Sequence, residues 1–262
     1  MELGLKGRVA IVAASSQGLG KAVALGLARE GAILAMCART EATLADAADE
    51  IRRETGAGVI ARAIDVTKED QVRSFVADTV SEYGGVDICV ANAGGPPSKT
   101  FAETTAADWR AAAELNLMST VFLAKETLPQ MKERRWGRFI AITSVSVKQP
   151  IEGLILSNSV RSGVNALVKS LANEYGPYNV LVNNVCPGYT ATARLQDLAG
   201  RLAEREGASK KTIEERWASQ TPLRRIGLPE EFANLVVFLA SERASYITGA
   251  SIPVDGGIVR GY

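Results

Sequence analysis

The chain has 262 residues, of which 47% are hydrophobic, and its formal net charge is +1. This length and composition allow a large buried core and fit one or two domains. The near-neutral charge provides no global field that would attract nucleic acid or an anionic membrane. No apolar run approaches the roughly 20 residues of a membrane-spanning helix, and the N-terminus lacks the basic-then-apolar pattern of a signal peptide. We therefore expect a cytoplasmic protein with no membrane or nucleic-acid partner.

Histidine is absent, and the three cysteines lie far apart in the chain. The lack of histidine excludes Ser–His and Cys–His nucleophile pairs and every metal site that contains histidine. Cys37, Cys89 and Cys186 each follow an apolar stretch and form no C-x-x-C pair, so we expect buried, reduced thiols. We predict no metal site, and any chemistry must use another acid or base.

The first predicted element is a buried strand over residues 9–12, followed by a turn of small residues and a helix over 21–29. Gly18 and Gly20 in this turn allow a ligand to approach the backbone, because glycine has no Cβ. The helix N-terminus that follows offers unpaired N–H groups and a positive dipole end to an anion. The turn is therefore a candidate phosphate site, and a tight turn without a ligand is the alternative.

Short apolar runs then alternate with helical segments along the chain. Helices are predicted over 41–54, ending at Gly56, over 71–83, opened by a capping box at 67–70, and in a segment that ends near Trp136. The alternation predicts right-handed β-α-β units and one doubly wound α/β domain over residues 1–262, with helices on both faces of a parallel sheet of about seven strands. The further strands are predicted over residues 32–38, 59–66, 86–90, 139–143, 179–185 and 251–254.

Polar residues recur where the predicted strands end. In doubly wound sheets, ligands bind at the carboxyl ends of the strands. This recurrence therefore favours a binding site over plain loop structure. The residues concerned are Ser15, Ser16, Arg39, Thr40, Asp65, Asn92, Ser144 and the segment 187–190.

Several motifs agree in order and spacing with one family. Over essentially its whole length the chain resembles the short-chain dehydrogenases/reductases, and within them the 3-oxoacyl-acyl-carrier-protein reductase branch. The resemblance implies a Rossmann-type fold, a nicotinamide cofactor, a carbonyl or alcohol substrate and a homotetramer. The motifs, in chain order, are the turn 13–20 (similar to T-G-x-x-x-G-x-G), Asp65–Val66, Asn92-Ala93-Gly94 (similar to N-N-A-G), Asn116, Ser144, Pro187-Gly188 with Thr192 (similar to P-G-x-x-x-T), and the segments 228–231 and 244–257.

The pair that the family uses for proton transfer, Y-x-x-x-K, is replaced in this chain. The tyrosine position, thirteen residues after Ser144, is Ser157, and the lysine position is Arg161. The turn also departs from the pattern, since Ala13 and Ala14 stand where the family has threonine and its first glycine. The resemblance therefore supports the expected fold and cofactor site more strongly than it supports the family's proton-transfer chemistry.

The resemblance implies a cofactor site that extends along the carboxyl ends of the strands. An NAD site commonly places an acidic residue roughly 20 residues past the glycines. Arg39 and Thr40 occupy this region instead, and a guanidinium binds phosphate well, so we expect NADP rather than NAD. An ordinary solvated charge is the other interpretation of Arg39. The expected cofactor-binding residues are Ser15, Ser16, Gly18, Leu19, Gly20, Arg39, Thr40, Asp65, Val66, Asn92, Ala93, Gly94, Arg161, Pro187, Gly188, Thr190 and Thr192.

Four residues are expected at the reacting centre: Asn116, Ser144, Ser157 and Arg161. Ser144 would bond the substrate oxygen, and Asn116 would hold a water. A serine hydroxyl is a much weaker acid than tyrosine, whose pKa is about 10, and an arginine does not shuttle protons as a lysine can. The proton donor therefore stays open between three candidates: a water chain through Asn116, Ser157 and Arg161, the hydroxyl of Tyr189, and the side chain of Lys148 or Glu152.

Two functions are compatible with these residues. The first is an NADP(H)-dependent oxidoreductase acting on a carbonyl/alcohol pair, with 3-oxoacyl thioesters among the candidate substrates. The second is a dinucleotide-binding protein with weak or no turnover that acts as a sensor or structural partner. The segment 194–225 is predicted to be a helical substrate lid with eight basic and five acidic residues. This surplus would suit an acidic substrate or a phosphopantetheine carrier, and a solvated helical face is the plainer alternative.

Overall fold

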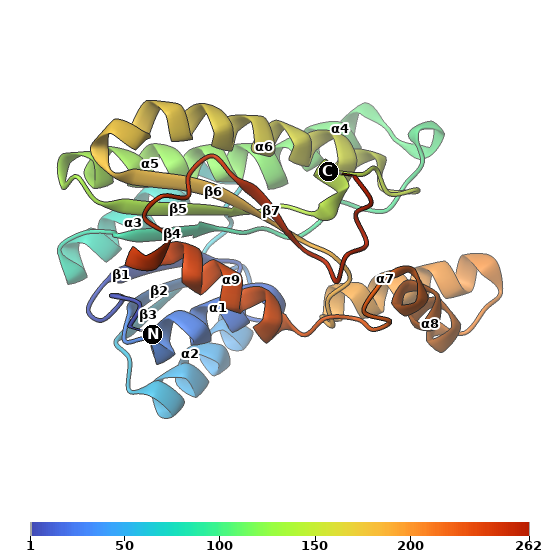
Figure 1. The fold of residues 1–262 in the computed structure, drawn as a ribbon, viewed down its shortest axis with the longest axis horizontal. Coiled ribbons are helices and arrows are strands. Elements are labelled where there is room, and N and C mark those ends of the chain that lie inside the picture. The colour runs from blue at the N-terminus through green and yellow to red at the C-terminus, as the bar shows by residue number, and fades with distance from the viewer. Residues whose placement is uncertain (1, 262) are drawn as a thin grey trace.

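A parallel sheet forms the centre of the molecule, with seven strands in the order β3-β2-β1-β4-β5-β6-β7 (Figure 1). This computed structural model describes residues 2–261. The central strands are buried along their whole length, because helices cover both faces of the sheet. The strands are β1 (Val9–Ala13), β2 (Ile33–Ala38), β3 (Val59–Ala63), β4 (Ile88–Ala91), β5 (Gly137–Ile142), β6 (Val180–Pro187) and β7 (Ser251–Val254).

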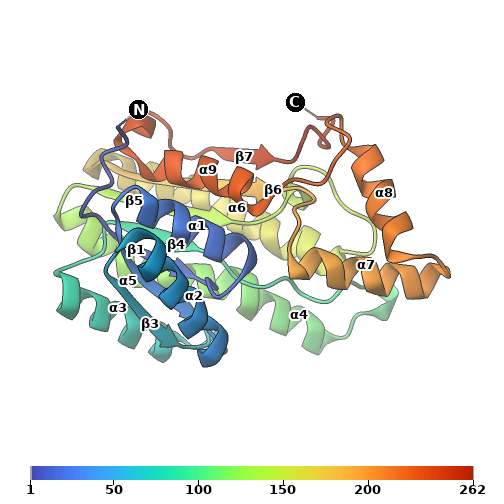
Figure 2. The same ribbon diagram turned by 90° about the horizontal axis from the view of Figure 1, so that it is seen from below.

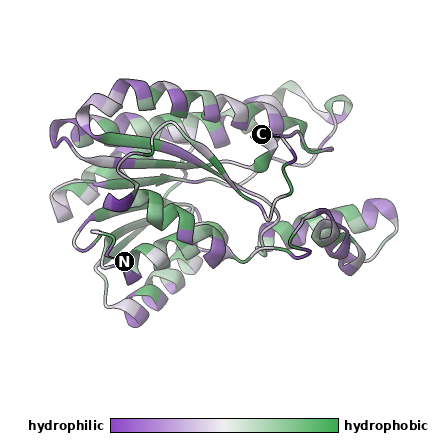
Figure 3. Ribbon diagram, viewed as in Figure 1, coloured by the Kyte–Doolittle hydropathy of each residue, from purple (hydrophilic) through white to green (hydrophobic). Residues whose placement is uncertain are grey.

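Two groups of three helices enclose the sheet and create two apolar cores. Helices α1 (Gly18–Arg29), α2 (Glu41–Thr55) and α9 (Pro229–Ala240) pack on one face. The opposite face is covered by α3 (Glu69–Tyr83), α5 (Ser119–Glu133) and α6 (Ile155–Tyr175). Hydrophobic residues predominate in the strands, whereas the helices alternate hydrophobic and hydrophilic positions, as Figure 3 shows. The structure therefore confirms the expected single, doubly wound α/β domain.

The other α-helices lie around the carboxyl ends of the strands. Helix α4 (Ala106–Ala112) continues into α5 through a π-helical stretch, Ala113–Met118. Helices α7 (Ala193–Glu206) and α8 (Lys210–Gln220) project beyond the strand ends (Figures 1 and 2) and have a small apolar cluster of their own. Short 3-10 helices occur at Phe101–Glu103, Val145–Val147, Gly176–Tyr178 and Glu242–Ala244.

The order of the strands fixes where a ligand would bind. The chain moves outward from β1 to β3 and then returns to place β4 on the other side of β1. The crossovers on the two sides of this point lie on opposite faces, so the carboxyl ends of β1 and β4 diverge into neighbouring loops. The residues that follow these two strands are therefore the centre of the candidate site.

Two local predictions differ from the structure. Strand β3 ends at Ala63, so Asp65 and Val66 lie in the loop that follows and not within a strand. The predicted capping box at 67–70 is wrong, because Lys68 is the N-cap of α3 and makes no side-chain cap. Instead, the Asp65 carboxylate accepts the Thr67 backbone N–H at 3.0 Å, which turns the chain before the helix begins.

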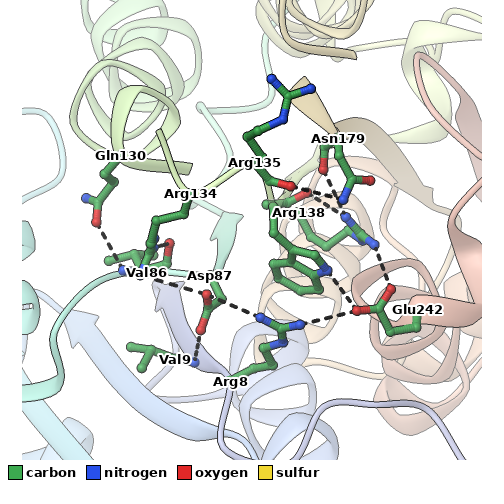
Figure 4. Close-up of polar contacts among 12 residues, drawn as sticks. Arg8, Val9, Val86, Asp87, Gln130, Arg134, Arg135, Arg138, Asn179 and Glu242 are labelled. Atoms are coloured by element: carbon green, nitrogen blue, oxygen red, sulfur yellow. Dashed lines mark hydrogen bonds and ion pairs between the residues drawn. The ribbon is translucent and has the colours of Figure 1, made fainter. Parts of the chain in front are cut away.

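A polar cluster lies at the opposite end of the sheet, where the strands begin (Figure 4). Arg138 in β5 is only 1% exposed, and its Nη2 lies 3.5 Å from the Glu242 carboxylate. The guanidinium groups of Arg138 and Arg8 lie 4.3 Å and 3.7 Å from the centre of the Trp136 ring. Burial lowers the pKa of Arg138 to about 10, and the charge of Glu242 opposes this shift. This buried arginine is thus balanced by a carboxylate and an aromatic face.

Candidate active site at the carboxyl ends of the strands

The turn between β1 and α1 is shaped by close backbone contact. A Cβ at Gly20 would overlap the carbonyl oxygen of Ala14, and Gly18 has a φ of +57°. Ala14, which stands where the family has its first glycine, has a φ of +48°. This value lies in the left-handed region, which glycine adopts more readily than alanine. Gln17, the N-cap of α1, makes no side-chain cap, and the first turn holds no acidic residue. The first N–H groups of α1 therefore remain available to an anion, and this turn fits a dinucleotide diphosphate.

The two serines of the turn have different surroundings. Ser15 is fully buried, and its hydroxyl donates to the carbonyl of Val12 at 2.9 Å. Its backbone N–H donates to the carbonyl of Cys37 at 3.1 Å, so Ser15 ties β1 to β2. Ser16 is half-buried, and its hydroxyl is the one that remains for a phosphate.

The segment after β6 lies opposite the glycine turn. A Cβ placed on Gly18 would be 3.4 Å from the Thr192 methyl group, so the two segments meet. Thr192 also caps α7 by accepting the N–H of Leu195 at 3.3 Å. Thr190 is buried beside Gly188, to whose carbonyl its hydroxyl donates at 3.4 Å. The structure thus brings Gly18 together with the segment 187–192.

The expected adenosine side of the site lies at the ends of β2 and β3. Arg39 and Thr40 are exposed directly after β2, and Arg39 forms no ion pair with any residue that the structure describes. Val66 is 7% exposed, and Asp65 is half-buried in the adjacent loop. The structure therefore places all four residues at the same end of the sheet, and Leu19 in the first turn of α1 is half-buried.

The loop after β4 connects the cofactor residues with the expected reacting centre. Asn92 donates from Nδ2 to the carbonyl of Ala14 at 3.4 Å, which joins this loop to the glycine turn. The carbonyl of Gly94, beyond the half-buried Ala93, accepts two hydrogen bonds. One comes from Asn116 Nδ2 at 2.8 Å and the other from Arg161 Nη2 at 3.2 Å.

Asn116 lies in the π-helical stretch and is 4% exposed. Its Oδ1 is buried and has no hydrogen-bond partner in the described part of the chain. A buried acceptor without a donor is unfavourable, so this oxygen fits a bound water or a donor on a ligand.

Ser144 follows β5 and caps the short helix Val145–Val147. Its Oγ accepts the N–H of Ser146 at 3.1 Å, which leaves the hydroxyl proton for another acceptor. The hydroxyl of Ser146 is buried without a partner among the described residues. It was not predicted as a site residue, because nothing in its sequence context distinguishes it from a turn serine.

Arg161 joins the carboxyl ends of two strands. Its Nη1 donates to the carbonyls of Ile142 and Thr143 at 3.1 Å and 3.0 Å, in addition to the bond with Gly94. The residue is 7% exposed, and Ser157, one turn earlier on α6, is 8% exposed. Burial lowers the pKa of Arg161 to about 10, and the positive charge of Arg194 acts in the same direction.

The other candidate proton donors lie in less favourable places. Tyr189 stacks on Trp217 in the cluster of α7 and α8, with ring centres 4.9 Å apart, and burial raises its pKa. Lys148 and Glu152 are exposed in the loop after Ser144. Within residues 2–261 the structure shows no group of histidine, cysteine and carboxylate side chains that could hold a metal ion. Cys37, Cys89 and Cys186 are buried and free, as predicted.

Arg194 was predicted only as one charge of the lid, but it lies beside this centre. From the first turn of α7, its Nη2 donates to the carbonyl of Pro96 at 2.7 Å. The two residues are 98 positions apart, so no local pattern in the sequence could have linked them.

Comparisons with known proteins agree with this geometry. The family model described as Enoyl-(Acyl carrier protein) reductase matches residues 13–259. The 3-oxoacyl-[acyl-carrier-protein] reductase of Aquifex aeolicus is 34% identical over 258 residues, which cover 98% of this chain and 100% of that protein. A crystal structure of L-sorbose reductase from Gluconobacter frateurii, complexed with NADPH and L-sorbose, matches with 34% identity, a TM-score of 0.95 and complete coverage of both chains.

A structure of a 7α-hydroxysteroid dehydrogenase with NADH and a bile acid also matches, with 30% identity and a TM-score of 0.89, over 99% of this chain and 97% of that one. These relatives span nearly the whole chain, and the two solved structures share its fold. The chain belongs to the short-chain dehydrogenase/reductase family and is an oxidoreductase of that family.

Proposed function

We propose that this protein is an NADP(H)-dependent oxidoreductase that transfers hydride between the nicotinamide and a small carbonyl/alcohol substrate. The proposal rests on one observation: an anion site and a free hydroxyl group lie at the same end of the sheet, where the strands end. The uncapped start of α1 at Gly18 offers an anion site, and Ser144 presents a free hydroxyl proton a few strands away. A 3-oxoacyl thioester is one candidate substrate, following the reductase of Aquifex aeolicus.

The proposed preference for NADP rests on Arg39. Its exposed guanidinium, without an ion-pair partner in the described chain, is available to a phosphate on the adenosine ribose. The L-sorbose reductase structure holds NADPH, whereas the hydroxysteroid dehydrogenase structure holds NADH, so the family itself allows both cofactors.

The nicotinamide supplies the hydride when the cofactor is bound. Ser144 would donate a hydrogen bond to the carbonyl oxygen of the substrate, and Asn116 Oδ1 would orient a water next to it. Arg161 would stabilise the negative charge that develops on the oxygen, because its buried guanidinium has no carboxylate partner among the described residues. With Tyr189 packed in the lid, water guided by Asn116 and Ser157 is the proton source that we favour.

A cofactor-binding protein with little turnover is the second candidate. It is favoured by the three side-chain hydrogen bonds that Arg161 makes to the described residues, because all three go to backbone carbonyls of the fold. General acid catalysis is typically worth about 10²–10⁴-fold. The loss of tyrosine is therefore expected to slow hydride transfer without preventing cofactor binding.

The decisive experiment separates binding from turnover. The protein is titrated with NADPH while the nicotinamide fluorescence is followed, and NADPH oxidation is then measured with a panel of ketones and 3-oxoacyl thioesters. Oxidation that saturates with one substrate class supports the proposal. Tight NADPH binding with no oxidation across the panel would leave the second candidate.

One substitution tests the choice of cofactor. Arg39→Asp removes the phosphate-binding charge and adds an acid that suits the ribose hydroxyls of NAD. We expect NADPH to bind at least about tenfold more weakly and NADH to bind more tightly. Arg29→Asp, also exposed but paired with Glu54, is the matched control. Equal losses for both cofactors would contradict the proposed role of Arg39.

The assembly and location of the protein are also proposals. We propose a homotetramer, following the family resemblance, and a cytoplasmic location. Light scattering of the purified protein tests the first, and fractionation of cells that express the chain tests the second. No helix within residues 2–261 is long and apolar enough to cross a membrane.

A further inference from the structure

The charges of the lid are paired unevenly. The ion pairs of this segment involve basic residues of α8 and of the segment that follows it. By contrast, Arg194, Arg201 and Arg205 of α7 form no ion pair with any residue in the described part of the chain. The paired residues are Lys211 with Glu215 (3.8 Å), Arg216 with Glu206 (2.7 Å) and Arg225 with Glu231 (2.6 Å).

The three arginines of α7 share one side of the helix. Their separations of seven and four residues repeat close to whole helical turns. At one end, the Nη2 of Arg194 would lie 2.6 Å from a Cβ on Gly95, and at the other, the Nη1 of Arg205 would lie 4.0 Å from a Cβ on Gly153. The two ends of this side of α7 therefore lie near the loops that follow β4 and β5, and all three arginines are exposed.

Arg194 and Arg161 hold the same short loop from two directions. Arg161 donates to the carbonyl of Gly94, and Arg194 donates to the carbonyl of Pro96. Each guanidinium is therefore held by neutral acceptors, although the two positive charges are close enough for Arg194 to lower the pKa of Arg161. Partial desolvation and the positive charge of Arg201 lower the pKa of Arg194. The carboxylate of Asp197, one turn further along α7, opposes this shift but is not within ion-pair distance.

Two neighbouring guanidinium groups without a carboxylate repel each other, and the repulsion matters most for Arg161, because Arg161 is buried whereas Arg194 is exposed. They are also well suited to a planar anion, which accepts parallel N–H bonds from arginine. The Gly94 carbonyl is shared with Asn116 of the proposed reacting centre, so the anion would lie next to the carbon that accepts hydride.

We propose that Arg194 binds a carboxylate of the substrate while the neighbouring Arg161 faces the reacting carbonyl oxygen, so that the substrate is a small keto acid or the corresponding hydroxy acid. The inference rests on the proposed function and deepens it. In the reduction, hydride from NADPH forms the new C–H bond, the C=O π bond opens, and a proton from water completes the hydroxyl group. Arg194 is a specificity-determining residue in this scheme, and Arg201 and Arg205 continue the positive side of α7 outward.

The test uses the full chain with NADPH and pairs of substrates that differ only in charge. Each keto acid is compared with its methyl ester, and each 3-oxoacyl pantetheine thioester is compared with its phosphorylated form. The variants are Arg194→Gln, Arg194→Lys and the double variant Arg201→Gln/Arg205→Gln. Arg216→Gln is the matched control, because this lid arginine is paired with Glu206.

We expect Arg194→Gln to lower kcat/KM for the keto acid on the order of a hundredfold, as expected when one partner of a charge pair is removed. The change for the ester is expected to stay within about threefold. Arg194→Lys should restore part of the preference for the acid, since it keeps the charge but not the fork of donors. NADPH affinity should be unchanged in all variants.

A binding measurement keeps the test independent of turnover. Malonate is titrated into the protein with and without NADPH, and the midpoint of thermal unfolding is compared with that obtained with neutral malonamide. A stabilisation by malonate that disappears in Arg194→Gln supports the proposal even if no substrate is turned over. If NADPH itself fails to bind, the proposed function fails, whereas the response to malonate still reports on the anion site.

Three results would overturn the inference. Equal losses for acid and ester in Arg194→Gln would make the residue structural. Weaker NADPH binding in Arg194→Gln would assign its charge to the cofactor. A preference for the phosphorylated thioester that is lost only in Arg201→Gln/Arg205→Gln would identify a carrier-arm phosphate as the anion.

Discussion

A buried arginine lies at each end of strand β5, Arg138 from the strand itself and Arg161 from α6, and the two have different partners. Arg138 at the amino end lies against Glu242 and the ring of Trp136 (Figure 4). Arg161 reaches the carboxyl end, where it meets backbone carbonyls and the positive charge of Arg194. Burial lowers the pKa of each to about 10.

The difference between them is where the balancing charge comes from. At the amino edge, the protein supplies its own carboxylate, so the charge contributes to holding strands together. At the carboxyl edge, no described carboxylate pairs with Arg161, so the charge remains available to a bound molecule. The comparison shows that a buried charge serves stability or function according to its partner and not according to its depth.

The largest expected effect concerns the proton donor. Ser157→Tyr combined with Arg161→Lys restores the family pair, and a tyrosine next to a lysine is a much better acid than serine. We expect the rate of NADPH oxidation with a simple ketone to rise by about 10²–10⁴-fold. Arg138→Lys is the control at the other end of β5 and should leave this rate unchanged.

The same experiment can contradict the assignment of Arg161 to function rather than to stability. If the double variant binds NADPH as well as the original chain but is no faster, then the carboxyl edge uses another acid, or none. Arg161 would then act only as a connection between strands, as Arg138 does.

A smaller effect is expected on stability. Arg138→Met removes one of the two ion-pair partners of Glu242 and the stack on Trp136, and we expect the free energy of unfolding to fall by about 3 kcal/mol. Arg161→Met also loses hydrogen bonds, but it relieves the repulsion with Arg194, so we expect a loss of about 1 kcal/mol. Urea unfolding of both variants measures the difference, and a larger loss for Arg161→Met would contradict the comparison.

The smallest expected effect is a dependence on pH. A guanidinium is charged below its pKa, so Arg161 retains its charge up to a pH of about 10 and loses it as the pH rises further. Hydride transfer to a carbonyl is expected to slow above this pH in the original chain. Arg161→Met should be slow already and should lack this step, and a pH profile of kcat for both proteins checks it within the range where they stay folded.

The parts predictable from the sequence were those with a local signature. Gly18 and Gly20, followed by a helix, indicated the turn, and the alternation of apolar runs and helices indicated the sheet. The capping box predicted at 67–70 was wrong because it requires the Thr67 N–H as a donor to Asp70. In the structure this N–H donates to the Asp65 carboxylate instead.

The partners of the arginines could not be predicted, because they depend on contacts between distant segments. Arg161 was expected in the site, but its carbonyl partners depend on how far β4 and β5 extend toward α6. Arg138 was left outside the predicted strand 139–143, since its charge gives no sign of burial and its partner Glu242 is 104 positions away. Hydrogen bonds over such separations have no pattern within a short window of sequence.

The π-helical stretch at Ala113–Met118 has a consequence for the whole α4–α5 segment. Each additional residue in a helix rotates the subsequent side chains by about 100° around the axis, so the two halves present differently phased sides. Before the stretch, Asp108 of α4 meets Lys99 of the loop after β4 at 2.9 Å. After it, Phe122 and Leu128 of α5 turn into the core against the sheet. A change of phase within one continuous helix thus allows the segment to place Asn116 in the candidate site and to pack α5 against the core.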